Sequence, residues 1–363
     1  METTDSTTVA TTDPTFGLDT FGDVTVDPAG RPVPADQVIR NVVAEAVLAD
    51  HVGVDAFGLG EHHRPDFAVT APEVVLAAIA ARTENIRLGT AVTVLSSDDP
   101  VRVYERFATL DAVSDGRAEI TLGRGSFVES FPLFGYDLAD YENLFEEKLD
   151  LFAALRSEQP VTWSGSTRTA LHAADVHPKT AAGAIPTWVG VGGSPQSVVR
   201  AARYGFALML AIIGGDPARF APYSRLYRQA LAEFGHAPQP VGVHAPGLVA
   251  DTDAEAIELA WPHFQAMRDR IGQERGWGPT SRAEFERDIA SGAQHVGSPD
   301  TVARKIAQTL RATGANRFDL KYSMGTLPHD VLMHGIELYG TDVIPRVRRL
   351  LAAPTAPVAA NVG

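Results

Sequence analysis

The chain of 363 residues contains no cysteine. This absence excludes disulfides, thiol catalysis and metal sites built on thiolates. Basic residues are in deficit as well, because 31 Lys and Arg stand against 45 Asp and Glu, a formal net charge of −14. Nucleic acids are bound through clustered Lys and Arg, so this composition argues against a nucleic-acid partner. An acidic protein is also repelled by anionic surfaces.

Long apolar runs are missing too. No segment approaches the roughly 18 uninterrupted apolar residues of a membrane span. The start, METTDSTTVATTDPT, lacks the basic and apolar regions of a signal peptide. We therefore expect a cytoplasmic protein without membrane association. Residues 1–14 and 353–363 are too poor in apolar side chains to offset the entropy of ordering, and we predict that both tails are disordered.

Eight short apolar segments have the pattern of buried strands, and several are continuously apolar, as strands covered on both faces are. They begin at Phe16, Ala56, Ile86, Ala118, Thr187, Phe206, Val241 and Arg317. Segments with helical periodicity lie between them. Residues 99–116 and 298–314 each begin with a capping residue followed by proline, and each ends at glycine.

Eight strands that alternate with helices indicate an α/β fold with a parallel sheet, either closed into a barrel or open and doubly wound. Because eight strands close a barrel, we predict a single TIM (β/α)8 barrel over residues 15–352. Residues 160–186 and 270–296 exceed a minimal barrel. We predict that they are insertions at the C-terminal face of the strands that frame the active site, the alternative being surface elaboration.

Polar residues follow the second strand, at the end where barrel enzymes place their chemistry. Glu61, His62 and His63 stand together there. In an extended segment adjacent side chains point to opposite sides, so only one of the two histidines can face the barrel axis. Catalytic zinc needs about three protein ligands, and the other histidines show no ligand spacing. We therefore predict no metal site.

A second group of polar residues fits an anion. Ser194 is placed to cap a helix after two glycines, and exposed N–H groups at a helix start favour an anion. Arg124 ends the fourth strand between two glycines, where a phosphate would be a suitable partner. The alternatives are a capped helix without ligand and a salt bridge at the barrel rim. No complete G-x-G-x-x-G, P-loop or G-x-S-x-G motif is present.

Several of these segments together resemble the luciferase-like flavin monooxygenases, the superfamily of bacterial luciferase. The resemblance rests on GVDAFGLGEHH, IRLGTAVTVLSSDDPVRVYE, LDAVSDGRAEITLGRGSF and VGVGGSPQSVVRAARYG, with HVGSPDTVARKI also similar. It extends from about residue 16 to residue 349. Light emission is not implied, because the cysteine of bacterial luciferase is replaced by Gly123. The glutamate of the luciferase α subunit is likewise replaced by Gly193.

The resemblance also implies roles for single residues. Arg124, Ser194 and Ser197 would bind the flavin phosphate, with a backbone contact at Gly193. His62 would be the catalytic histidine beside the flavin. With an ordinary pKa near 6.5 it could act as a base or as a hydrogen-bond partner.

Two further expectations follow from the same resemblance. Glu61 or His63 would orient His62. Ala91 and Val92 would form a non-prolyl cis peptide under the flavin ring.

The activity that the resemblance implies is oxygenation of a small organic substrate with O2 and non-covalently bound reduced FMN. A separate reductase would supply the reduced flavin, since no nicotinamide fingerprint is present, and a homodimer is expected. One alternative is a coenzyme F420-dependent oxidoreductase that transfers hydride on the same barrel. Another is a non-catalytic flavin-binding protein, against which the presence of His62 argues.

Overall fold

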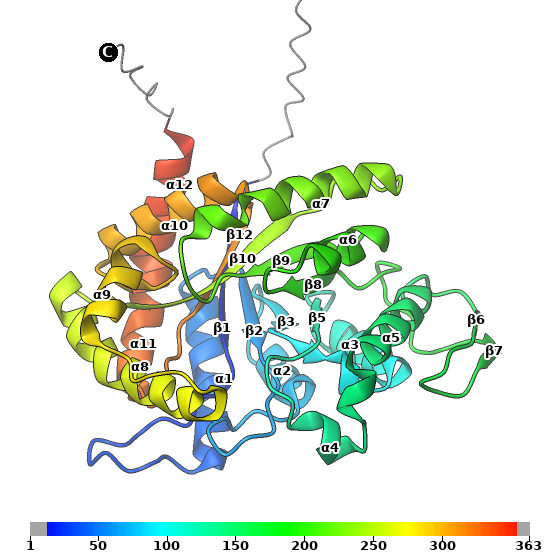
Figure 1. Cartoon of the computed structure of the whole chain (residues 1–363), viewed down its shortest axis with the longest axis horizontal. Helices are drawn as coiled ribbons and strands as arrows, with labels where there is room; N and C mark the ends of the chain where they lie inside the picture. The colour runs from blue at the N-terminus through cyan, green and yellow to red at the C-terminus, as the bar shows by residue number, and fades with distance from the viewer. Residues whose placement is uncertain (1–12, 354–363) are drawn as a thin grey trace, which may run out of the picture.

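Parallel strands alternate with helices and form a barrel in the computed structural model, which describes residues 13–353 (Figure 1). The strands of the barrel are β1 (Thr15–Thr20), β2 (Ala56–Leu59), β3 (Arg87–Thr90), β4 (Thr93–Val94), β5 (Ile120–Gly123), β8 (Thr187–Val191), β9 (Ala207–Ala211), β10 (Val241–Val249) and β12 (Arg317–Lys321). Their order is β3-β2-β1-β12-β10-β9-β8-β5-β4. The two tails predicted to be disordered lie almost wholly outside the described residues.

The sheet closes because its two ends belong to one stretch of chain. β3 and β4 are the two halves of the third predicted strand, and they stand at opposite ends of the strand order. Leu88 of β3 also forms a parallel bridge with Ala118, just before β5. All eight predicted strands are present, and the predicted TIM barrel is confirmed.

Helices cover the outside of the barrel (Figure 1). They are α1 (Ala35–His51), α2 (Pro72–Ala80), α3 (Pro100–Val113), α4 (Ser130–Phe134), α5 (Tyr141–Leu155), α6 (Pro195–Arg203), α7 (Ala221–Glu233), α8 (Asp253–Arg275), α9 (Arg282–Ser291), α10 (Pro299–Thr313), α11 (His329–Leu338) and α12 (Ile344–Ala352). Short 3-10 turns occupy Leu95–Ser97, Leu138–Asp140 and Pro217–Phe220, and a π-helical turn occupies Tyr339–Val343.

The predicted helix starts are confirmed by their caps. The Asp99 side chain accepts from the backbone N–H of Val101 and of Arg102, and the Ser298 side chain accepts from that of Thr301. The apolar core lies between strands and helices, with side chains such as Phe57 fully buried. None of the helices within residues 13–353 is long and apolar enough to cross a membrane.

The interior of the barrel contains buried charges. Arg317 of β12 pairs at 2.6 Å with Glu119, which directly precedes β5, and β12 and β5 are not neighbours in the sheet, so the contact crosses the interior. Arg317 also pairs with Asp319 at 2.8 Å. Buried charges need such partners, because an unpaired one is costly. Room for them comes from glycine, since a Cβ at Gly17 would lie 2.3 Å from Oδ1 of Asp319.

The first insertion, residues 160–186, packs against α5. It joins the end of α5 to the start of β8, and it forms the antiparallel hairpin of β6 (Val161–Trp163) and β7 (Leu171–Ala174). Nε1 of Trp163 donates to Asp150 of α5 at 3.0 Å. Figure 1 shows the hairpin on the outer side of α5. Arg168 of this insertion pairs at 3.2 Å with Asp99, the cap of the helix that follows β4. That the insertion frames the active site stays a prediction.

The second insertion reaches the strand ends as predicted. It comprises the end of α8, α9 and β11 (His295–Gly297), which pairs with the last residues of β10. Arg270 of α8 pairs with Asp66 at 3.0 Å. Glu274 accepts from both terminal nitrogens of Arg64. Because Arg64 and Asp66 follow β2, these contacts tie the insertion to the segment that carries His62.

Candidate active site

His62 lies in an aromatic enclosure at the end of β2. Its ring centroid is 4.9 Å from that of Phe21, 4.6 Å from that of Phe67 and 5.2 Å from that of Phe127. Its backbone N–H donates to Val69 at 3.2 Å. The side chains of both adjacent histidines are largely buried, but it is the ring of His62 that the three phenylalanines surround. This placement provides a dry, apolar setting for one imidazole.

Burial lowers the pKa of His62 to about 4. The nearby cations Lys321 and Arg64 act in the same direction, and the carboxylate of Asp23 opposes them. The imidazole is therefore neutral at neutral pH. The expectation of a base that titrates near its ordinary pKa is corrected, and the role left for His62 is that of a neutral hydrogen-bonding group.

The pKa of His62 gives a direct prediction. Its NMR signal, assigned with His62→Gln, should titrate with a midpoint at about pH 4. Unfolded histidine keeps an ordinary pKa near 6.5. The folded state therefore binds fewer protons between these values, and the contribution of His62 to stability falls as the pH drops from about 6.5 to about 4. A midpoint near 6.5 would show that the ring is solvated.

Glu61 and His63 pair with each other instead of orienting His62. Nε2 of His63 lies 2.9 Å from Oε1 of Glu61. Oε2 of Glu61 accepts from the backbone N–H of Val94 at 3.1 Å, which ties the segment after β2 to β4. The carboxylate nearest His62 is that of Glu129, with Oε1 3.9 Å from Nδ1. Glu129 was not predicted, because nothing in the sequence relates a residue after β5 to this histidine.

The peptide bond between Ala91 and Val92 is cis, as predicted. Glycines of three strands surround these two residues. A Cβ at Gly123 would lie 2.5 Å from Cγ2 of Val92, and one at Gly190 would lie 3.1 Å from Cγ1. A Cβ at Gly58 would lie 3.2 Å from that of Ala91. The glycines therefore leave room for Ala91 and Val92 to occupy the barrel mouth.

The predicted anion-binding residues come together at the start of α6. Ser194 caps this helix and accepts from the N–H of Ser197 at 3.4 Å. Arg124, from the end of β5, donates Nη2–H to Oγ of Ser197 at 3.4 Å. Arg200, one turn along α6, donates to the same oxygen at 3.4 Å. Gly193 has a φ of 118°, a conformation that favours glycine.

Carboxylates of α5 neutralise both of these guanidinium groups. Arg124 pairs with Glu142, and Arg200 pairs with Glu146 and, at 3.5 Å, with Glu142. The rim salt bridge considered as an alternative for Arg124 is thus present. The Glu142 side chain is 63% exposed, so it can turn outward into water. Arg124 could therefore exchange Glu142 for another anion. Two neighbouring arginines, Arg124 and Arg200, are suited to bind a phosphate.

Arg200 lies with Ser197 over the first turn of α6, as its place three residues after Ser197 predicts. Glu142 was missing from the predicted site and could not have been found, since only the fold brings α5 beside the end of β5. Within residues 13–353, no three His, Asp or Glu side chains are grouped as a metal would require.

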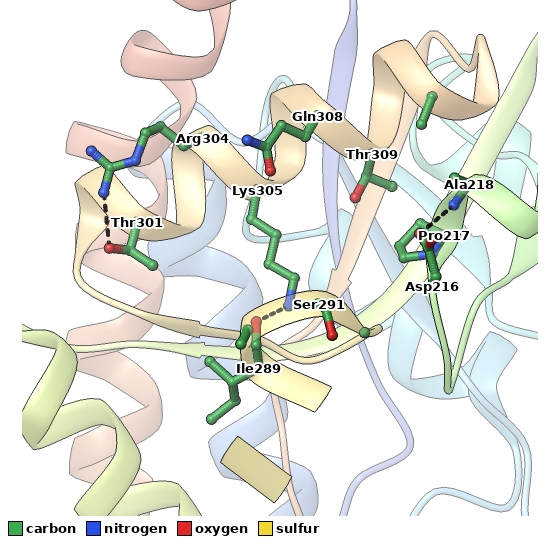
Figure 2. Close-up of a pocket in the computed structure, with 13 residues that line it drawn as sticks. Asp216, Pro217, Ala218, Ile289, Ser291, Thr301, Arg304, Lys305, Gln308 and Thr309 are labelled. Atoms are coloured by element: carbon green, nitrogen blue, oxygen red, sulfur yellow. Dashed lines mark hydrogen bonds between the residues drawn. The ribbon is translucent and has the colours of Figure 1, made fainter. Parts of the chain in front are cut away.

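A separate hollow lies outside the barrel between α9, α10 and residues 216–218 (Figure 2). Lys305 crosses it and donates to the backbone carbonyls of Asp288, Ile289 and Gln294. Burial lowers the pKa of Lys305 to about 8. Because its ammonium group already serves three carbonyls at the end of α9, we assign this lysine a structural role.

The fold and the site together define a class, the α/β-barrel enzymes whose chemistry lies at the C-terminal ends of the strands. The family model for luciferase-like monooxygenases matches residues 19–317, and the chain belongs to this family. It is 28% identical over 328 residues to 4-hydroxyprotoasukamycin monooxygenase of Streptomyces nodosus subsp. asukaensis, covering 85% of this chain and 86% of that protein. Because it belongs to a family of monooxygenases, the protein is an enzyme.

Solved structures agree with this fold. The oxygenating constituent of 3,6-diketocamphane monooxygenase from Pseudomonas putida, in complex with FMN, is 21% identical with a TM-score of 0.74, covering 93% of this chain and 99% of that one. An F420-dependent secondary alcohol dehydrogenase in complex with an F420–acetone adduct is 18% identical with a TM-score of 0.72, with the same coverage. At these identities the likeness extends to the fold alone.

Proposed function

We propose that the enzyme binds reduced FMN non-covalently and uses O2 to oxygenate a small organic substrate. The observation that carries this proposal is the convergence of Arg124 and Arg200 on Ser197, at the start of a capped helix and at the same end of the barrel as the aromatic enclosure of His62. FMN carries a phosphate at one end and a flat isoalloxazine ring at the other, joined by a ribityl chain. The chain offers a suitable setting for each.

Bound reduced FMN would supply the electrons that activate O2. The residues of the chain bind and orient it. Arg124, Arg200 and the N–H groups at the start of α6 would hold its phosphate. The phenylalanines around His62 exclude water, and neutral His62 offers a hydrogen bond within that dry space. Ala91 and Val92 would support the ring, in the room left by the surrounding glycines.

The charges near the anion site favour FMN over coenzyme F420. F420 carries an acidic glutamyl tail beyond its phosphate, whereas FMN ends at its phosphate. Glu142 and Glu146 stand at this position and would repel such a tail. Hydride transfer with F420 is the second candidate function, and it rests on the similar fold of the F420-dependent dehydrogenase. A separate flavin reductase and a homodimer belong to our proposal through the family resemblance.

The activity is tested with the enzyme, FMN, NADH and an unrelated flavin reductase in the presence of isotopically labelled O2. A panel of small ketones, aldehydes and alkenes serves as substrates. We expect one labelled oxygen atom in an organic product. Products formed without labelled oxygen, or only with reduced F420, would contradict the proposal.

A bound phosphate would replace Glu142 as the partner of Arg124, and this replacement gives a further prediction. Glu142→Gln should tighten FMN binding by roughly 3- to 10-fold, because a carboxylate no longer competes for Arg124. Affinity is measured by quenching of flavin fluorescence. Riboflavin, which has no phosphate, should bind equally to both proteins, and Glu233→Gln at the far end of α7 is the control. Weaker FMN binding by Glu142→Gln would mean that Glu142 holds Arg124 in place for the ligand.

A further inference from the structure

A second imidazole contacts Phe21, which also contacts His62. The ring of His244 is stacked on that of Phe21, with centroids 6.2 Å apart and planes at 11°. His244 belongs to β10, where it is level with Ala211, the last residue of β9. It therefore stands at the C-terminal end of the barrel interior. Phe21 thus contacts both histidines.

Asp19 fixes the orientation of the His244 ring. Oδ2 of Asp19 lies 2.7 Å from Nδ1 of His244, and Asp19 is buried. An ionised carboxylate only accepts hydrogen bonds, so Nδ1 carries a proton. None of the described residues forms a hydrogen bond with Nε2, and the His244 side chain is 13% exposed. A histidine whose Nδ1 is held by a carboxylate and whose Nε2 has no protein partner can hydrogen-bond to a ligand through Nε2.

The charges around His244 favour its protonated form. Burial opposes its charge, but the carboxylates of Asp19 on β1 and Asp319 on β12 outweigh burial and raise the pKa. Lys321, also on β12, acts against them. The inward residues of β9 near this level, Met209 and Ala211, carry no titratable group. The raised pKa favours the form of His244 in which both nitrogens carry protons, whereas the pKa of His62 is lowered.

We propose that His244, held by Asp19, donates its Nε2–H to an oxygen atom of the molecule bound at this end of the barrel. The acceptor is a carbonyl or anionic oxygen, either of the flavin ring or of the organic substrate. In the second case the substrates are ketones or phenolates and not plain hydrocarbons. This inference rests on the proposed function for the location of the active site. It assigns to the site a cationic donor beside the neutral His62, a division of roles that suits acid–base chemistry.

The first test examines the protein without any ligand. The full chain is labelled with 15N-histidine, and His244 is assigned with His244→Gln. At pH 7 we expect both ring nitrogens of His244 to be protonated, with Nε2–H exchanging with water. His295 is the matched control, because it is fully buried with both nitrogens engaged, by Ala293 and Thr309. Asp19→Asn should lower the pKa of His244. A neutral His244, or an Nε2–H as protected as the His295 ring, would overturn the proposal.

The second test identifies the acceptor by adding FMN, cyclohexanone or methylenecyclohexane separately. A shift of the His244 Nε2 signal with FMN alone assigns the acceptor to the flavin. A shift with cyclohexanone but not with methylenecyclohexane, which has CH2 in place of the oxygen, assigns it to the substrate. An unchanged signal in protein saturated with FMN and with cyclohexanone would refute the donor role. Failure of FMN to bind would refute the proposed cofactor, and the water-exchange result would still decide the state of His244.

Discussion

Arg124→Ala should weaken FMN binding by roughly 10- to 150-fold. A charge-assisted hydrogen bond contributes about 1.5–3 kcal/mol, which corresponds to this change in Kd. The loss stays within this range because Arg200 also reaches Ser197, and because Glu142 must leave Arg124 before a phosphate can bind. Flavin fluorescence titration measures the effect. Thermal stability should change little, since the Arg124 side chain is partly exposed and its partner lies in water.

Two controls make the Arg124 result specific. Riboflavin lacks the phosphate, so its affinity should be the same for Arg124→Ala and for the wild type. Arg102→Ala removes an arginine from the outer face of α3, where it pairs with Glu105, and should leave FMN binding unchanged. If Arg124→Ala binds FMN as tightly as the wild type, Arg124 is only a rim salt bridge.

His62→Gln should lower the rate of substrate oxygenation by about 100-fold or more, the usual scale for a lost acid–base or hydrogen-bonding group. A larger share of the consumed O2 should appear as hydrogen peroxide. FMN affinity should stay nearly constant, because the phosphate residues lie on other strands. Glutamine fills the enclosure of Phe21, Phe67 and Phe127 better than alanine does, so His62→Gln separates loss of chemistry from loss of packing.

The neighbouring histidine provides the matched comparison for His62. His63→Ala removes the partner of Glu61, which holds the backbone of Val94. We therefore expect His63→Ala to lower the melting temperature more than the oxygenation rate. A severe loss of turnover in His63→Ala, together with a mild one in His62→Gln, would reverse the assignment of the catalytic histidine.

Local signals in the sequence were sufficient for much of this structure. The alternation of apolar strands with capped helices predicts the barrel, and Asp99 and Ser298 cap where their motifs indicate. Gly193, Ser194 and Ser197 are near neighbours in the chain, so their grouping at one helix start follows from local geometry. Arg124 joins them because the strands β5 and β8 are adjacent.

Contacts between distant parts of the chain could not be predicted in this way. The pairing of Arg124 with Glu142 depends on how α5 packs. The low pKa of His62 depends on a phenylalanine after β1 and another after β5, which only the folded barrel brings to the ring. His244 and Asp19 are separated by 225 positions, and neither belongs to a motif. The packing of residues 160–186 as a hairpin against α5 could not be predicted either, because their polar composition suits a surface hairpin as well as an active-site cover.

The most direct test of the account is an anaerobic titration of the protein with reduced FMN and, in parallel, with reduced coenzyme F420, followed by the absorption spectrum of each. We expect saturable binding of reduced FMN, which Arg124→Ala weakens and Glu142→Gln strengthens. Reduced F420 should bind much more weakly. Tight binding of reduced F420 with no binding of reduced FMN would contradict it.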